Sequence, residues 1–177
     1  MNKTKKTLFV SLSVCIALIL TVFLTNYISL QKPLSDVIDS DPRNDGIELS
    51  AHYAYYVAPS TLVINVKSAS GDKSAADMFR VLLQYAEKLS ERDFDRIELS
   101  SRGKVKFVLE GDYFKTLGKE YGAQNPVYTM RTFPENLYRP DGQRAFGSWT
   151  GGLLGVVGKQ MEDFKEFHKH WYIEDMN

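Results

Sequence analysis

The sequence predicts an α+β fold, with one N-terminal transmembrane helix followed by a single domain. In that domain a mixed β-sheet, formed by a βαβ unit and a hairpin, packs against two main helices. Three features of the chain predict this: an uncharged apolar segment at the N-terminus, β-branched segments that alternate with an amphipathic segment, and a second amphipathic segment at the end. The 177 residues, 44% of them hydrophobic, suffice for one globular domain beside the membrane segment.

The N-terminal segment carries the clearest signal in the chain. No charged residue lies between Thr7 and Leu30, and a helix of that length is longer than the ~30 Å hydrocarbon core of a bilayer. The two small-x-small positions near its end both contain Tyr27, which disfavours cleavage of the segment as a signal peptide. We therefore expect residues 7–30 to form an uncleaved signal anchor.

The charges around the span predict its orientation. Lys3, Lys5 and Lys6 precede it and Asp36 follows it, so the positive-inside rule places residues 1–6 in the cytoplasm as a short tail. The rest of the protein then lies on the periplasmic or extracellular side of the inner (plasma) membrane, and it carries slightly more acidic than basic residues. That balance disfavours nucleic-acid binding. The one cysteine, Cys15, lies within the span, so we expect no disulfide in the domain.

After the span, residues 31–50 are polar and acidic and contain Pro33, Pro42 and Gly46. They show no sustained periodicity and predict a linker that separates the membrane from an extracytoplasmic domain of residues 51–177.

The first half of the domain predicts the βαβ unit and the hairpin. Residues 61–66 are β-branched and almost continuously apolar, which is typical of a central strand. Residues 75–90 place apolar side chains at helical spacing after the N-cap Ser74. Residues 94–100 and 104–110 read as two strands joined by a turn at residues 101–103.

Three further elements are expected in the second half. Residues 112–121 predict a short helix that Gly122 ends. Residues 126–133 alternate in polarity and predict a strand that Pro134 ends. A last helix is expected from near residue 149 to about residue 172, with one apolar and one polar face.

The residues with the greatest potential for ligand binding gather between residues 125 and 158. Arg131, Arg139 and Arg144 precede a glycine-rich helix start at residues 150–152, and guanidinium groups beside free helix N–H groups can bind phosphate or carboxylate. Surface salt bridges, for example with Glu135, explain the same arginines. The candidate ligand or partner-binding residues are Arg131, Glu135, Tyr138, Arg139, Arg144, Trp149, Thr150, Gly151 and Gly152.

Other patterns in this half allow two interpretations each. Aromatic residues such as Tyr138 and Trp149 could line a groove for a sugar or peptide, with Glu135 and Asp141 as a carboxylate pair, or could simply pack in the core. Gly151 and Gly155 lie four residues apart and indicate close backbone packing, which we expect inside the domain rather than against a partner.

Histidines and carboxylates of the last helix form a metal-like pattern. Glu166 and His170 lie on one helix face, but helix-stabilising ion pairs explain this spacing as well as a metal site does. We expect His168, on the apolar face, to be partly buried and hydrogen-bonded. The sequence therefore predicts no metal site, cofactor or catalytic residue.

The function expected from these observations is binding. The chain is predicted to be a membrane-anchored envelope domain that contacts an envelope protein or a cell-wall ligand, without inferred catalysis. Two alternatives remain open: an envelope hydrolase that acts on an anionic or glycan substrate, and a structural subunit of a membrane homo-oligomer. A deep pocket of converging carboxylates and arginines would favour the first alternative, and an exposed glycine face would favour the second.

Overall fold

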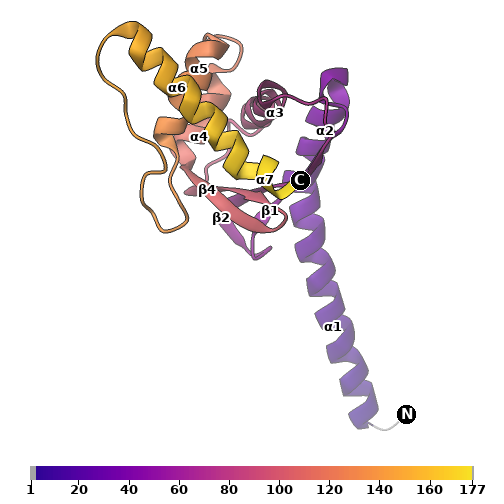
Figure 1. Cartoon of the computed structure of the whole chain (residues 1–177). Helices are drawn as coiled ribbons and strands as arrows, with labels where there is room; N and C mark the ends of the chain where they lie inside the picture. Colours follow the sequence, from indigo (N-terminus) through magenta and orange to yellow (C-terminus); the bar gives the residue numbers. More distant parts are fainter. Residues whose placement is uncertain (1–2, 177) are drawn as a thin grey trace.

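The computed structural model describes residues 3–176 and has an α+β fold (Figure 1). Its mixed sheet has the strand order β1-β2-β3-β4. The strands are β1 (Ile47–Ala54), β2 (Ala58–Ala69), β3 (Arg96–Ser101) and β4 (Lys104–Glu110). β2 and β3 pair in parallel, whereas the two outer pairs are antiparallel, which confirms the predicted βαβ unit and hairpin.

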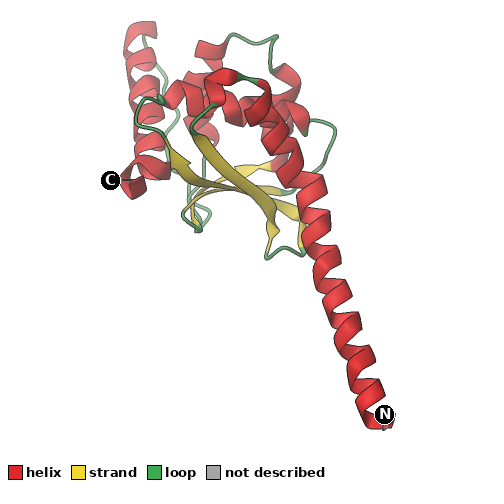
Figure 2. Ribbon diagram, turned by 90° about the vertical axis from the view of Figure 1, so that its right-hand side faces the viewer, coloured by secondary structure: helices red, strands yellow, loops and turns green. Residues whose placement is uncertain are grey.

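The helices gather on one side of the sheet, and the first of them extends far beyond it (Figure 2). The α-helices are α1 (Lys3–Asn26), α2 (Lys32–Ser40), α3 (Ala75–Lys88), α4 (Gly111–Glu120), α5 (Pro126–Thr132), α6 (Leu153–His168) and α7 (Glu174–Met176). Short 3-10 or π segments lie at η1 (Tyr27–Gln31), η2 (Pro42–Asn44), η3 (Phe133–Asn136) and η4 (Lys169–Ile173).

Within the described residues, one helix is long and apolar enough to span a membrane. It is continuous through α1, η1 and α2, and its large apolar side chains from Leu12 to Ile28 are exposed. Leu30, Leu34 and Val37, in contrast, are buried in the core of the domain. The first part of this helix is therefore exposed, whereas its second part, from about Leu30, packs in the core of the folded domain.

The predicted linker at residues 31–50 is wrong where it covers α2 and the start of β1. For α2, the misleading signal was Pro33, which the prediction treated as an interruption of regular structure. A proline inside a helix has no N–H for the carbonyl four residues before it, which is usually a reason for the helix to end. Here Arg92 Nη1 donates a hydrogen bond to that carbonyl, on Ser29, at 2.6 Å. Tyr85 donates its hydroxyl proton to the next carbonyl, on Leu30, at 3.0 Å. Two side chains of the domain therefore donate to helix carbonyls next to Pro33 and support the π turn at η1.

The same helix covers the free edge of β1. Gln31 Oε1 accepts the N–H of Ala51 at 2.9 Å, and Asn26 Oδ1 accepts the N–H of Tyr53 at 2.8 Å. Since an uncovered edge strand offers its N–H groups to other chains, these two contacts close the sheet on this side. They also show that β1 runs antiparallel to the helix.

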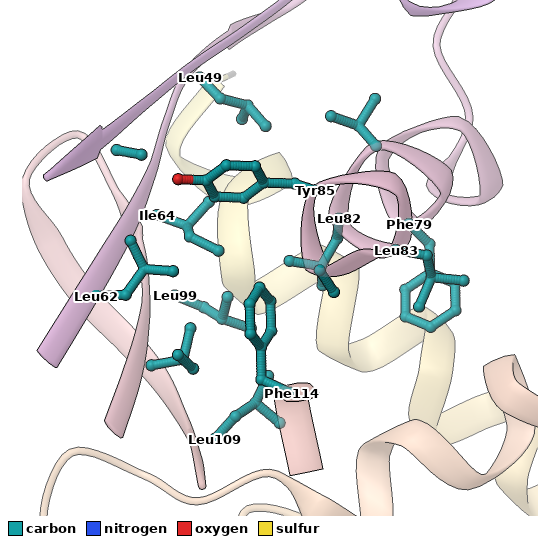
Figure 3. Packing of buried hydrophobic residues seen from close by; sticks show 14 of the residues in the cluster. Leu49, Leu62, Ile64, Phe79, Leu82, Leu83, Tyr85, Leu99, Leu109 and Phe114 are labelled. Atoms are coloured by element: carbon teal, nitrogen blue, oxygen red, sulfur yellow. The ribbon is translucent and has the colours of Figure 1, made fainter. Parts of the chain in front are cut away.

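The core lies between the sheet and α3, and α4 closes it from one side (Figure 3). Alternate β2 residues such as Leu62 and Ile64 are fully buried in it. α3 begins at a capping box in which Ser74 and Asp77 bond each other's backbone N–H groups. The predicted helix at residues 75–90 is therefore confirmed apart from its last two residues.

The strand predicted at residues 126–133 is wrong, because these residues form the helix α5 and the start of η3. Asn125 Oδ1 accepts the N–H of Val127 at 2.9 Å, and Pro126 occupies the first helical turn. An asparagine N-cap followed by proline is a helix start signal that outweighs the alternating polarity of this short segment. The last helix was predicted with its start four residues too early, since α6 begins at Leu153.

Candidate binding surface

The three candidate arginines have separate partners. Arg131, on α5, donates from Nε to Gln160 Oε1 at 3.0 Å, and Gln160 Nε2 in turn donates to Glu135 Oε1 at 2.8 Å. This chain of side chains joins α5 and η3 to α6. Arg131 and Glu135 are therefore brought together through Gln160, a buried residue that the sequence analysis did not identify.

Arg144 stabilises the loop after η3. Its guanidinium donates to the backbone carbonyl of Glu135 at 2.5 Å and lies over the ring of Tyr138, 5.3 Å from the centroid. Tyr138 forms isolated β-bridges with both Arg144 and Val108, so the loop is held at the outer edge of β4. The guanidinium thus has a structural role in this loop.

Arg139 lies at the exposed turn that precedes Arg144, and its N–H donates to the Gln143 carbonyl at 2.7 Å. The N–H of Gly142 donates to the Arg139 carbonyl at 2.9 Å, and the Gln143 N–H donates to Asp141 Oδ1 at 3.0 Å. Glu135 and Asp141, considered above as a carboxylate pair, therefore have unrelated partners. Arg139 borders a shallow hollow with Phe146 on the side of the last helix.

The residues before α6 are exposed. Trp149 Nε1 donates to Asp163 Oδ2 at 2.6 Å and holds the loop on the helix. Thr150, Gly151 and Gly152 are exposed, and Gly152 provides no side-chain cap. Of the three arginines predicted near this helix start, Arg131 contacts Gln160 and Arg144 contacts the Glu135 carbonyl instead.

The glycines of α6 do not serve packing inside the domain. A Cβ placed on Gly151, Gly155 or Gly158 would meet no atom within 4 Å. The interpretation of Gly151 and Gly155 as an internal packing surface is therefore wrong, and this helix face is open to solvent.

A groove that the sequence analysis missed lies between η2, α3, α4 and α5. It has a volume of about 420 Å³, within the range of small-molecule and peptide-side-chain sites. Its floor is apolar and buried, and consists of Phe79, Leu83 and Leu117. Because residues 126–133 were interpreted as a strand, the wall that Thr129 and Met130 of α5 provide was not foreseen.

Two arginines on the rim of this groove, Arg43 and Arg80, are paired with carboxylates, and Glu120 lies on the same rim. Arg80 donates to Asp77 at 2.7 Å and to Asn44 Oδ1 at 3.0 Å. The pKa of Asp77 is lowered to about 2, chiefly by the hydrogen bond from the Ser74 side chain. Arg43, on the same rim, pairs with Asp41 at 2.6 Å, and that hydrogen bond holds the carboxyl pKa of Asp41 far below its usual value. The two arginines on the rim therefore already have partners within the domain.

Among residues 3–176, no group of three histidine, cysteine or carboxylate side chains converges as a metal site. Glu166 and Glu174 bond opposite nitrogens of His170, at 3.2 Å and 3.0 Å. The two carboxylates thus lie on either side of the imidazole instead of around one point, and the stripe consists of helix ion pairs.

His168 differs from its expected state. Its side chain is fully buried among aromatic rings that include Phe164, Phe167 and Trp171. Neither ring nitrogen has a hydrogen-bond partner among the described residues. Burial lowers the pKa of His168 to about 3, so the ring is neutral at physiological pH.

Comparison with known proteins gives no family for this chain. A scan against protein-family models, a search of curated proteins and a search of solved structures each found no match. The argument about function therefore rests on the geometry described above.

Proposed function

We propose that the protein is a single-pass membrane protein whose domain binds an envelope protein or a cell-wall ligand outside the cell. The observation that carries the proposal is the apolar helix that begins as α1, whose large apolar side chains, among them Leu12, Leu20 and Leu24, are exposed. The N-terminal lysines support a cytoplasmic location for its first end, by the positive-inside rule.

The helix holds the domain in a fixed orientation. Asn26 and Gln31 bond β1, Arg92 and Tyr85 bond helix carbonyls, and Leu34 lies in the core. A flexible tether would let the domain turn freely, whereas this connection turns it with the helix. Which surface faces the bilayer is then a property of the fold.

The groove between α3, α4 and α5 is the best-supported binding surface. It is lined by Arg43, which follows the end of α2 and so lies on the side of the domain remote from α1. Its apolar floor suits an apolar segment of an envelope protein, and Val127 and Tyr128, exposed on α5, enlarge the apolar surface beside it. This assignment favours a protein partner over a cell-wall glycan.

Site-specific photo-crosslinking in intact cells tests the binding site. A photoreactive amino acid replaces Gln124, which lines the groove, in the full-length chain. We expect a discrete crosslinked product that disappears when Ala76→Arg introduces a long side chain into the groove. The control Gln143→Arg adds the same charge on an exposed loop outside it and should leave the product intact. A product that persists in Ala76→Arg contradicts the groove assignment.

The open glycine face of α6 favours a second function, that of a structural subunit of an oligomer. Gly155 and Gly158 leave a bare helix surface that a neighbouring helix can approach closely. The mass of the detergent-solubilised full-length protein tests this. An oligomer that Gly155→Leu converts to monomers supports the second function, whereas a monomeric wild-type protein contradicts it.

A further inference from the structure

The turn between β1 and β2 presents large apolar side chains to its surroundings. Tyr55 is 89% exposed and Val57 is 67% exposed, and Tyr56 between them is also exposed. Few residues of the folded domain expose so much apolar side chain. Exposed apolar surface of this kind at the tip of a hairpin indicates a contact with a membrane or a partner molecule.

The backbone of this turn is unusual for its residue types. Tyr55 and Tyr56 have φ angles of 52° and 65°, so both central residues lie in the left-handed region. Turns with positive φ at both central residues are normally made of asparagine and glycine, which reach positive φ with little strain. The fold therefore retains two bulky aromatic residues at positions that disfavour them.

The turn is fastened to the apolar helix. Asn26 Nδ2 donates to the carbonyl of Tyr56 at 2.8 Å, and the rings of Tyr56 and Phe23 lie 5.3 Å apart. Because β1 runs antiparallel to the helix, the turn at its end points back along α1 towards the N-terminus. Figure 2 shows the tip of the sheet beside α1, with the remainder of the helix projecting past it.

The position of the turn along the helix agrees with the thickness of a bilayer. From Thr7 to Asn26 the helix rises about 30 Å, which equals the hydrocarbon core. The turn contacts the helix at Phe23 and Asn26, at the outer end of that span. Tyr27 is exposed at the same level, and Lys32 follows one turn later. Tyrosines at this depth match the aromatic belt found at membrane interfaces.

We propose that the turn at residues 55–57 is a second membrane contact, which inserts between the headgroups and the acyl chains of the outer leaflet. This inference rests on the proposed function, since it requires α1 to span the bilayer. The amphipathic tyrosine rings bury their apolar edges and keep their hydroxyl groups among the headgroups. Together with α1 the turn fixes the tilt and rotation of the domain and keeps the groove directed away from the bilayer.

Spin-label accessibility in reconstituted full-length protein tests the proposal. Cys15 is the only cysteine, so Cys15→Ala gives a background for single labels. Labels at Tyr55→Cys, Gly71→Cys and Leu20→Cys are compared in vesicles of phosphatidylcholine and phosphatidylglycerol at 3:1. Gly71 is the matched control, because it lies in an exposed turn at the opposite end of the β1–β2 pair and has open space around it.

We expect the label at residue 55 to collide with oxygen more often than with a water-soluble nickel complex, as the label at residue 20 does, and the label at residue 71 to show the reverse. If the label at residue 55 behaves like that at residue 71 while the label at residue 20 is in lipid, the turn does not insert and α1 alone is the anchor. A label at residue 20 that is open to the nickel complex overturns both proposals. Melting curves exclude misfolded variants, and Val57→Cys replaces Tyr55→Cys if the latter does not fold.

Discussion

Asn26 Oδ1 accepts the backbone N–H of Tyr53 at 2.8 Å, so this buried polar side chain of the first helix is a cap for the edge strand of the sheet. Its amide also donates to Tyr56, beyond the end of the same strand. An asparagine in an apolar span usually suggests contact between membrane helices. Here it joins the end of the span to the domain.

We expect Asn26→Leu to lower the free energy of unfolding by about 1–3 kcal/mol, because the N–H of Tyr53 would be left buried without an acceptor. The apolar character of the span would increase, so membrane insertion should not suffer. Thermal unfolding in detergent micelles, followed by circular dichroism, measures the change. Thr25→Leu, at the exposed neighbouring position, serves as the control and should melt as the wild type does. Equal melting of both variants would refute the role of Asn26.

A second prediction concerns Arg92, which compensates for Pro33. Its guanidinium donates to the Ser29 carbonyl and to the Tyr53 hydroxyl, and it lies 5.5 Å from the ring centroid of Phe94. A lysine ammonium cannot reproduce this planar arrangement. We therefore expect Arg92→Lys to destabilise the domain by about 1–2 kcal/mol in chemical denaturation, whereas Arg96→Lys, on a more exposed surface pair, should change the stability little. A loss of the same size in both variants would contradict this explanation.

The success of sequence reasoning on the sheet and its failure at the linker have the same physical origin. The apolar run from Leu62 to Val66 and the capping box at Ser74 are local signals, and the structure follows them. Pro33 is a local signal too, but its cost is met by Arg92, a residue distant in sequence. The tertiary structure decides which helix carbonyls receive such a donor. The local sequence pattern holds no information about it.

The candidate site was predictable only in part, for a similar reason. Clustering in sequence selected Arg131 and Arg144 as ligand-binding candidates, and in the structure both organise the loop and helix around η3. Their partners, however, are Gln160 and a backbone carbonyl, which no motif indicates. The groove depends on how α5 lies against α3 and α4, so its apolar floor could be recognised in the sequence only as core.

A matched pair of glycines gives a third prediction. A Cβ on Gly118 of α4 would overlap the Ala86 carbonyl of α3, so this glycine permits the two helices to touch. We expect Gly118→Ala to cost at least ~2–3 kcal/mol, since backbone must move. Gly155→Ala, in open space on α6, should instead stabilise the monomer by up to about 1 kcal/mol through helix propensity. Urea unfolding of the two variants measures both changes, and a stable Gly118→Ala variant would contradict the tight α3–α4 contact.

His168 gives the last prediction, which concerns acid stability. Its pKa falls from 6.5 to about 3 on folding because burial disfavours the charged ring. As the pH falls below 6.5, the His168 ring is protonated in the unfolded chain but stays neutral in the folded domain. The free energy of unfolding therefore decreases by up to about 1.4 kcal/mol per pH unit until the pH nears 3. Between pH 6.5 and 5 carboxylates contribute little, since their ordinary pKa values lie lower.

His168→Leu should remove this decrease and raise stability at neutral pH by about 1–3 kcal/mol, because two unpaired ring nitrogens leave the core. His170→Gln keeps the buried ring and should keep the decrease. Denaturation curves at pH 7, 6 and 5 distinguish these outcomes, and an unchanged slope in His168→Leu would show that another group controls the acid response.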